Sequence, residues 1–290
     1  MLKEVLAQLN FGASGGVKII DATLGDGGHT IELLKRGYCV LGLDVSDVSL
    51  KNATTRITEL GLADRFRAVK GNFKNIEKLA TESEFAGVSG ILFDLGYSSS
   101  QLLEDEVGLS FLKDQPLDMR LSSELGVTAS DLVNVLAEKD LARMFYDLSD
   151  EKYAGRFARA IVEARKLKKL QTTKDLADLI KSVSSLGYEH GRIHPATRVF
   201  QALRIAVNGE FENLKVSLPQ AAHLLLPGAR MIVITFHSSE DRLVKEFGRS
   251  APPELKIKET TKKPILPTET EVSLNTRSRS AKMRVFEKVL

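Results

Sequence analysis

Three predicted buried strands end in an acidic residue, and these residues are Asp21, Asp44 and Asp94. The first is followed directly by a glycine-rich segment, DATLGDGGHT (Asp21–Thr30). In an open α/β sheet, ligands bind outside the carboxyl ends of the strands, where these residues would meet. Glycines let the backbone approach a ligand closely, and free N–H groups at the start of the next helix attract negative charge. The pattern predicts a nucleotide-type cofactor site.

The glycine segment discriminates between nucleotide cofactors. A P-loop would need Gly-Lys-Ser/Thr after the glycines, and the segment lacks it. Gly25 and Gly27 match the dinucleotide fingerprint G-x-G-x-x-G, but Thr30 stands where the third glycine should be. S-adenosylmethionine has no pyrophosphate, so a tight turn braced by Asp21 suffices, and Asp44 can accept hydrogen bonds from the ribose diol. This cofactor fits best, and the alternative is a structural turn that binds nothing.

A short motif after the fourth predicted strand indicates a reaction. Asp94-Leu95-Gly96-Tyr97 has the spacing of the (Asp/Asn/Ser)-Pro-Pro-Tyr motif of enzymes that methylate exocyclic amino groups, although Leu95 and Gly96 replace both prolines. A cytosine or adenine amino group is a poor nucleophile because its lone pair is delocalised into the ring. An acceptor such as Asp94 can bond the N–H and free the lone pair, while Tyr97 can stack on an extruded base. Phe73, after the third strand, either flanks a purine ring or packs in the core.

Alternating strand and helix signals predict the sheet that would hold these residues. The expected strands are Val17–Asp21, Cys39–Asp44, Phe66–Lys70, Gly90–Asp94, Arg230–Phe236 and Lys282–Val289. The expected helices around them are Thr30–Arg36, Ser49–Leu60, Ala196–Val207, Glu210–Leu226 and Glu240–Phe247, and the proline-rich stretch Pro252–Thr270 is expected to be a loop. This alternation indicates right-handed βαβ units and a parallel sheet, hence an α/β fold.

Between these two stretches the pattern is helical. Asp131–Leu148, Tyr153–Leu167 and Thr173–Val183 carry apolar residues at helical spacing. A crossover between neighbouring strands needs about a dozen residues, and the stretch from Asp94 to Met231 is far longer. We therefore expect a discontinuous α/β domain over residues 1–104 and 197–290, with an α-helical substrate-recognition domain inserted at residues 105–196.

The composition is that of an ordinary globular protein. The chain has 290 residues, of which 43% are hydrophobic and 27% charged, and this excludes a disordered chain. A single cysteine, Cys39, excludes an intramolecular disulfide and a cysteine-rich zinc site. The longest apolar stretch, Leu224–Phe236, is interrupted by proline, glycine and arginine, so we expect no membrane span. These features favour a reducing, cytoplasmic compartment.

Basic residues cluster at two places, although the net charge is only +3. Residues 152–174 hold eight basic side chains against one acid, and residues 277–288 hold five against one. Either cluster alone could be an ordinary solvated face, but two clusters flanking a cofactor site favour nucleic acid as the partner. Within them, the expected RNA contacts are Lys152, Arg156, Arg159, Arg165, Lys166, Lys168, Lys169, Arg277, Arg279 and Lys282.

Six ordered segments carry a family resemblance. They are DATLGDGGHT (Asp21–Thr30), DLGYSSSQL (Asp94–Leu102), PLDMR (Pro116–Arg120), TRVFQALRIAVNGE (Thr197–Glu210), FHSSEDRLVK (Phe236–Lys245) and RSRSAKMR (Arg277–Arg284). Through them the chain resembles the bacterial ribosomal RNA small subunit methyltransferase H family (MraW), which methylates N4 of a cytidine in the decoding centre of 16S rRNA. The resemblance implies a Rossmann-like S-adenosylmethionine-dependent methyltransferase domain with an inserted helical domain. Because the decoding centre is crowded with folded RNA, the expected substrate is the small ribosomal subunit, assembled or nearly so.

The resemblance also assigns roles to residues. It implies that S-adenosylmethionine contacts fall on Gly27, Gly28, His29, Asp44, Phe73, Asp94 and Gln101. It implies that the catalytic cleft, which holds Asp94 and Tyr97, is also lined by Asp118, Asn208, His237, Ser238 and Arg198. Arg120 and Arg198 are further expected RNA contacts. The alternatives are an Asp118–Arg120 pair, a surface salt bridge for Arg198 and a helix N-cap role for Ser238.

The chain departs from the family pattern at its start. Family members usually carry a His-x-Pro-Val-Leu stretch before the Leu-Lys-Glu-Val-Leu that opens here at Leu2. Its absence bears on closure of the substrate cleft. Single replacements at Tyr97, Gln115, Ser239 and Thr276 lie outside the inferred cofactor shell.

Other functions fit less well. His190 and His194 are four residues apart, but Gly191 and Pro195 indicate a loop and no third ligand is evident, so we expect no metal. A serine hydrolase would need a Gly-x-Ser-x-Gly elbow, which the sequence lacks. Two alternatives stay open: a methyltransferase for a protein or small molecule, which would need no basic clusters, and a non-enzymatic assembly factor, which would need no cofactor loop. The sequence also leaves open a homodimer.

Overall fold

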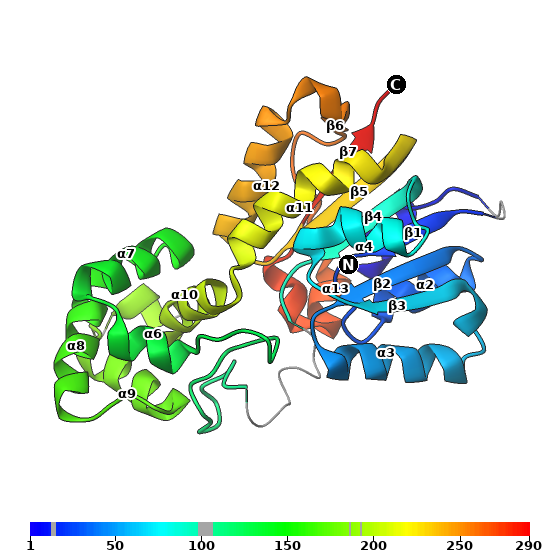
Figure 1. Cartoon of the computed structure of the whole chain (residues 1–290). Helices are drawn as coiled ribbons and strands as arrows, with labels where there is room; N and C mark the ends of the chain where they lie inside the picture. The colour runs from blue at the N-terminus through cyan, green and yellow to red at the C-terminus, as the bar shows by residue number, and fades with distance from the viewer. Residues whose placement is uncertain (13–15, 98–106, 186, 192) are drawn as a thin grey trace. The chain divides into compact units, whose positions relative to one another are not determined.

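The computed structural model describes residues 1–12, 16–97, 107–185, 187–191 and 193–290. The chain divides into two compact units, one made of Met1–Ser100 with Phe211–Leu290 and the other of Gln101–Glu210. The chain thus leaves the first unit once and returns to it after the second (Figure 1).

A seven-stranded sheet with the order β3-β2-β1-β4-β5-β7-β6 forms the centre of the first unit (Figure 1). Its strands are β1 (Lys18–Asp21), β2 (Cys39–Asp44), β3 (Phe66–Lys70), β4 (Val88–Asp94), β5 (Leu225–Thr235), β6 (Ile257–Glu259) and β7 (Lys282–Lys288). The first five of these strands run parallel. The strand order reverses between β1 and β4, and such a switch point opens a crevice at the carboxyl edge of the sheet.

The far side of the sheet corrects the expectation that it is parallel throughout. Strand β7 pairs antiparallel with both β5 and β6. Thr235 at the end of β5 lies opposite Lys282 at the start of β7, so the chain enters β7 at the edge where β5 finishes and must run back. The predicted loop Pro252–Thr270 also contains structure, namely the short helix η4 (Pro253–Leu255) and strand β6.

Helices cover both faces of the sheet. One face carries α1 (Leu2–Gln8), α2 (Gly28–Lys35) and α3 (Asp47–Glu59), and the other carries α4 (Ile76–Glu82), α11 (Glu210–Leu224) and α12 (Ser238–Ser250). Side chains alternate along each strand, so Ile91 and Phe93 pack in one core cluster while Leu92 packs in the other. Burial on both faces explains why the central strands have nearly continuous apolar sequences.

Strand β5 begins earlier than its sequence suggests. The helix before it ends at Leu224 rather than at the predicted Leu226, and the strand starts at Leu225 rather than at Arg230. Pro227 and Gly228 lie in an irregularity of the β4–β5 pairing, where the register shifts between Val88 and Gly90. Proline and glycine are tolerated within a strand at such bulges.

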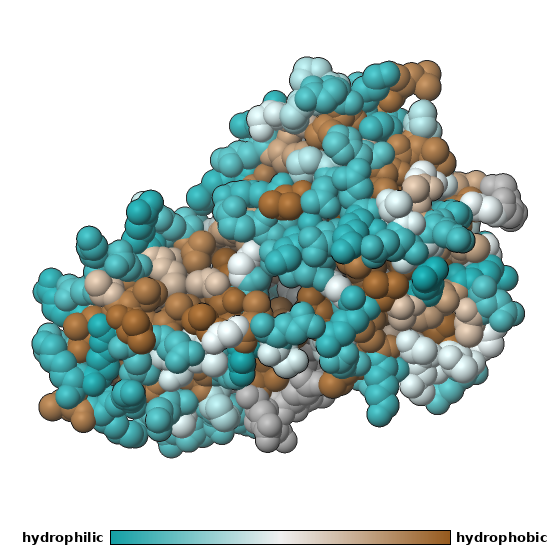
Figure 2. Space-filling model, in the orientation of Figure 1, coloured by the Kyte–Doolittle hydropathy of each residue, from teal (hydrophilic) through white to brown (hydrophobic). Residues whose placement is uncertain are grey.

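The second unit is helical. Its helices are α6 (Ala129–Val135), α7 (Glu138–Ser149), α8 (Ala154–Leu167), α9 (Thr173–Val183) and α10 (Ala196–Asn208), with the short helix η3 (Tyr188–Gly191). The predicted helix Asp131–Leu148 is two helices, because Leu136 and Ala137 adopt extended backbone between α6 and α7. Apolar and hydrophilic residues mix on the face seen in Figure 2.

Helix α10 lies in this second unit, although the sequence placed its residues after the insert boundary at 196. Val199, Phe200 and Leu203 on α10 are buried in one cluster with Phe145 and Phe157 of α7 and α8. The apolar face of α10 therefore completes the helical core, and the unit extends to Glu210.

The remaining short elements belong to the first unit. They are η1 (Ala63–Arg65), η2 (Phe73–Asn75), α13 (Glu269–Leu274) and η5 (Thr276–Ser280). No helix in the part of the chain that the structure describes is long and apolar enough to cross a membrane.

Candidate active site

The glycine turn between β1 and α2 is fixed by a buried carboxylate. Asp21 is 1% exposed, and it accepts hydrogen bonds from the Thr30 hydroxyl (2.8 Å) and the Thr23 backbone N–H (3.3 Å). The predicted bracing role of Asp21 is confirmed. Gly27 is the N-cap of α2 with φ 76°, and a Cβ there would lie 3.2 Å from the Cβ of Ala53. A side chain at Gly27 would therefore be both strained and crowded.

Asp44 joins the end of β2 to the same turn. Its Oδ2 accepts a hydrogen bond from the Gly25 N–H at 2.8 Å, and its Oδ1 accepts one from the Ser46 N–H at 2.9 Å. Burial raises the pKa of Asp44, while the amides of Ser46 and Gly25 oppose that rise. The Val45 amide is a third backbone donor to this carboxylate, whose two oxygens together have about four acceptor positions, so one is left for a ribose hydroxyl.

Asp94 links the two strands at the switch point. Its backbone N–H donates to the Thr23 hydroxyl at 2.7 Å, so the carboxyl ends of β4 and β1 are held together. Its Oδ2 lies 3.5 Å from Nδ1 of His29 on α2. Its Oδ1 is buried and has no hydrogen-bond partner in the described part of the chain. A buried acceptor without a partner is uncommon and points to a ligand group.

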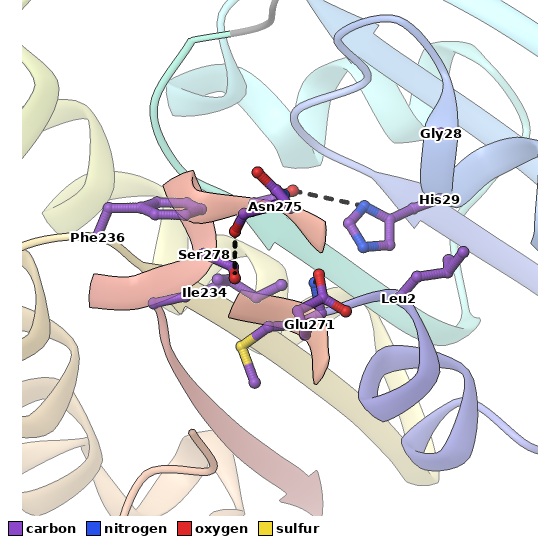
Figure 3. Close-up of a pocket in the computed structure, with 11 residues that line it drawn as sticks. Leu2, Gly28, His29, Ile234, Phe236, Glu271, Asn275 and Ser278 are labelled. Carbon is purple, nitrogen blue, oxygen red and sulfur yellow. Dashed lines mark hydrogen bonds and ion pairs between the residues drawn. The ribbon is translucent and has the colours of Figure 1, made fainter. Parts of the chain in front are cut away.

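A cavity of about 260 Å³ opens beside Asp94 and His29 (Figure 3). Figure 3 shows the side chains of His29, on α2, and Glu271, on a helix far along the chain, beside one space. All of its lining residues lie in the first unit. They are Met1, Leu2, Gly28, His29, Asp94, Ile234, Phe236, Glu271, Asn275, Ser278 and Ala281.

Burial sets the charge state of this site. It raises the pKa of Asp94 to about 6, with further upward contributions from Glu240 and Glu271 and an opposing one from the Met1 ammonium. Burial likewise raises the pKa of Asp21 to about 6. It lowers the pKa of His29, against the opposing effect of Asp21. At neutral pH the site therefore presents a poorly solvated carboxylate next to an uncharged imidazole.

His237 and a carboxylate that the sequence analysis missed form a pair next to the cavity wall. Nε2 of His237 lies 3.0 Å from Oε1 of Glu240, whose other oxygen accepts from the Phe236 N–H at 2.8 Å. Glu240 is 3% exposed. His237, rather than Ser238, is the N-cap of α12, since its Nδ1 accepts from the Glu240 N–H at 3.4 Å. Glu240 stands three residues after His237, which is the spacing of an N-cap and an N3 acid, and this spacing could have indicated that the two residues pair.

Glu271 and Asn275 were also missed. They line the cavity from α13 and the residue after it, and they follow directly on the stretch that we predicted as a loop. They lie far along the chain from Gly28, His29 and Asp94, and the antiparallel return into β7 brings them to the carboxyl edge of the sheet. No local sequence pattern indicates that return.

Some other predicted site residues lie outside this cavity lining or outside the described residues. Phe73 packs edge-on against Phe93 with ring centroids 5.7 Å apart, which is the core position that we weighed against a cofactor contact. Tyr97, just after β4, is 36% exposed. Gln101 lies outside the described residues. Among the described residues, no group of three or more His, Cys, Asp or Glu could hold a metal ion.

In the second unit, the predicted site residues Asp118, Arg120 and Asn208 are joined by hydrogen bonds in or to the loop before α6. Asp118 accepts a bidentate pair of hydrogen bonds from Arg120, both at 2.7 Å, and Arg120 lowers the pKa of Asp118 although burial opposes this. Asn208 is 8% exposed, accepts from the Leu121 N–H and donates to the Met119 carbonyl, each at 2.8 Å. Asn208 thus holds the loop that carries Asp118 and Arg120.

Several basic side chains already have partners within the protein. Arg198 donates to the Asp150 carbonyl at 3.0 Å, and Arg165 donates to the Val133 carbonyl at 2.7 Å. Arg159, Lys166 and Lys168 make exposed ion pairs with neighbouring acids. Such surface pairs contribute little stability and can exchange for other anions.

Only some of the basic residues at 277–288 are exposed at the surface. The Arg284 side chain is 5% exposed and pairs with Asp241 and Glu259, each at 2.7 Å, while Lys282 approaches Asp241 at 3.5 Å. The Lys288 ammonium donates to two backbone carbonyls. Arg284 and Lys288, which were not among the expected RNA contacts, are therefore held by partners within the protein. Arg277 and Arg279 on η5 are exposed.

Two solved structures share the fold. One is a Clostridium thermocellum protein assigned as an rRNA methylase, with a TM-score of 0.51 at 15% identity, covering 99% of this chain and 97% of that one. The other is a Streptococcus mutans protein assigned as a methyltransferase and solved in complex with SAH, with a TM-score of 0.50 at 11% identity and the same coverage. The first unit has the Rossmann-like fold of S-adenosylmethionine-dependent methyltransferases.

Sequence comparison gives the family. The model of the MraW methylase family matches residues 1–289, and the chain belongs to this family. A relative from Carboxydothermus hydrogenoformans, named Ribosomal RNA small subunit methyltransferase H, is 44% identical over all of this chain and 96% of its own length. Relatives with the same name from Persephonella marina and Coprothermobacter proteolyticus are each 43% identical, over 94% and 99% of this chain and 93% and 94% of their own lengths.

The substitution Asp94→Asn should stabilise the protein at neutral pH. The carboxyl group has a pKa of about 6 in the folded chain against an ordinary value of 3.8, so its ionisation lowers the free energy of unfolding as pH rises between about 4 and 6. An amide removes this cost, which is of the order of 3 kcal/mol at pH 7. Urea unfolding at pH 7 and pH 4 measures the effect.

The stabilisation should shrink towards zero at pH 4, where the native carboxyl is already protonated. The exposed Asp64→Asn is the matched control, and it should change the unfolding free energy by less than about 0.5 kcal/mol at either pH. An Asp94→Asn variant less stable than the parent at pH 7 would contradict the assigned charge state.

Proposed function

We propose that this chain transfers a methyl group from S-adenosylmethionine to the N4 amino group of a cytidine in the decoding region of 16S rRNA. Membership of the MraW methylase family and the names of the relatives support the reaction class and the rRNA substrate. The observation that carries the chemistry is the buried, unpartnered Oδ1 of Asp94 beside a cavity at the switch point of the sheet.

The residues around the glycine turn suit S-adenosylmethionine, which would supply an electrophilic methyl group. A Cβ built on Gly28 meets nothing within 4 Å, so this cavity-lining backbone leaves room for a ligand. Gly27, Gly28 and His29 would hold the cofactor at the start of α2, and Asp44 would bind its ribose. Phe73 and Gln101 complete the predicted cofactor contacts.

Asp94 would activate the substrate. Its free carboxylate oxygen can accept a hydrogen bond from an exocyclic amino group and localise the nitrogen lone pair for attack. Tyr97, two residues past the buried Leu95, is exposed enough to stack on the base. The catalytic roles of Asp118, Asn208, His237 and Ser238 remain predictions from the family resemblance, and the bonds of Asn208 favour a positioning role.

One face of α8 would provide phosphate contacts. Lys152, just before the helix, and Arg156, Arg159 and Lys166 on it are exposed and recur at helical spacing. We call these four residues the α8 stripe. Lys168 and Lys169 follow it, and Arg277 and Arg279 add exposed charge in the first unit. Phosphate contacts of this kind position an RNA without reading its sequence.

We expect the substrate in the cytoplasm to be the small subunit rather than naked rRNA. Small subunits from cells lacking this gene, incubated with the protein and labelled S-adenosylmethionine, should yield labelled N4-methylcytidine by nucleoside mass spectrometry. Asp94→Asn should lower the yield per unit time by about 100-fold or more, because it removes the carboxylate acceptor. Label in a different nucleoside, or equal labelling of naked rRNA, would overturn the assignment of the substrate.

Charge reversal of the stripe by Lys152→Glu, Arg156→Glu and Arg159→Glu should weaken binding to small subunits. It should also flatten the dependence of log Kd on log salt by about 0.7 to 0.9 for each lost phosphate contact. The control carries the same charge change at three exposed lysines of the first unit, Lys51, Lys78 and Lys215. If both triple variants lost the same affinity for small subunits, the proposal that α8 contacts the RNA would be wrong.

A further inference from the structure

Methyl transfer to an amino group leaves a surplus proton, and the cavity contains a pair of groups placed to take it. His29 and Asp94 both line the cavity, with His29 Nδ1 3.5 Å from Asp94 Oδ2. Two atoms of this pair, Asp94 Oδ1 and His29 Nε2, are buried without a hydrogen-bond partner in the described part of the chain. Asp94 Oδ1 is therefore an open acceptor, and in the tautomer that carries its hydrogen on Nε2 the Nδ1 of His29 can accept a proton from Asp94.

We propose that Asp94 and His29 act together as the acceptor of the proton that the substrate amino group loses. The proposal rests on the proposed function and adds to it the destination of the proton. Asp94 touches the amino group, and His29 acts through Asp94 as its positioning and proton-accepting partner.

Methyl transfer and the proton transfers that follow it conserve atoms and charge. The N4 lone pair forms the new N–C bond, and the S–C bond breaks with its electron pair staying on sulfur, which becomes a neutral thioether. The nitrogen then carries one proton too many and a positive charge. That proton passes to Asp94 Oδ1, and the Asp94 carboxyl group passes a proton to His29 Nδ1. The imidazolium that results lies beside the Asp94 carboxylate, and their attraction opposes the burial that lowers the pKa of His29.

The surroundings favour this pair over other bases. The titratable groups that face it are Asp21, Glu240, Glu271 and the Met1 ammonium. Asp21 already accepts hydrogen bonds from Thr30 and Thr23 of the glycine turn. Glu240 already accepts one from the Phe236 N–H and lies within ion-pair distance of His237. Burial lowers the pKa of His29 and raises the pKa of Asp94 to about 6, so at neutral pH the imidazole is neutral and the carboxylate is a usable base.

The test compares His29→Ala with chemical rescue. Single-turnover methylation of small subunits at saturating S-adenosylmethionine and pH 7 should slow about 100-fold or more in His29→Ala. Added imidazole should restore at least about tenfold of the lost rate, whereas 1,2,4-triazole, which has the same shape and is a much weaker base, should not. His29→Gln keeps polarity and bulk but accepts no proton, so it should be as slow as His29→Ala.

Two controls separate proton acceptance from folding and from cofactor binding. His223→Ala, at an exposed histidine of the same unit, should keep the parental rate. Calorimetry with S-adenosylhomocysteine measures how much affinity His29→Ala loses through the cofactor contact of His29, and at saturating S-adenosylmethionine that loss does not lower the single-turnover rate. In an Asp94→Asn background, His29→Ala should cause little further slowing, because His29 acts only through Asp94.

Several results would overturn the proposal. These are a parental rate in His29→Ala, rescue by triazole equal to rescue by imidazole, or a loss confined to cofactor affinity with a normal rate at saturation. Failure of the proposed function is distinguishable, since it would appear as absence of methyl transfer by the parental protein itself.

Discussion

The site depends on one unfavourable arrangement, the Asp94 carboxylate at the carboxyl end of β4, whose Oδ1 is buried without a hydrogen-bond partner in the described part of the chain. Asp94 is held there by the bond from its backbone to Thr23, and Thr23 in turn bonds to the buried Asp21. This chain of contacts crosses the switch point and fixes the acid, the glycine turn and the start of α2 in one geometry. The buried Oδ1 of Asp94 lacks a hydrogen bond, which is energetically unfavourable. A substrate amino group that donates a hydrogen bond to this oxygen would remove that cost.

The rest of the first unit holds that carboxylate in place and limits its exposure to 29% of the side chain. The two core clusters pack against both faces of the sheet and so hold the ends of β1 and β4 in place beside Asp94. The antiparallel return into β7 brings α13 and η5 to the same edge, where Glu271, Asn275 and Ser278 close the cavity. Removing water makes hydrogen bonds within the cavity stronger than they would be in solution.

Sequence reasoning reached the features that are local. Strands Cys39–Asp44 and Phe66–Lys70 agree with the observed bounds, and the acids at the strand ends followed from their positions. It failed where long-range packing decides. Contacts between distant segments decide the direction of β7 and place Glu271 beside the cavity. They also decide that α10 packs in the core of the second unit. The pairing role of Glu240 was missed, and the burial of Arg284 was not foreseen, because charge in sequence does not reveal burial.

The most direct test of the account is the pKa of Asp94 itself. In protein labelled with ¹³C at the aspartate carboxyl carbon, the Asp94 resonance can be assigned by its loss in Asp94→Asn and followed from pH 3 to pH 8. The account predicts a midpoint at about 6. A midpoint near the ordinary value of 3.8 would mean that Asp94 is well solvated, and the basis assigned here for activating the substrate would then be wrong.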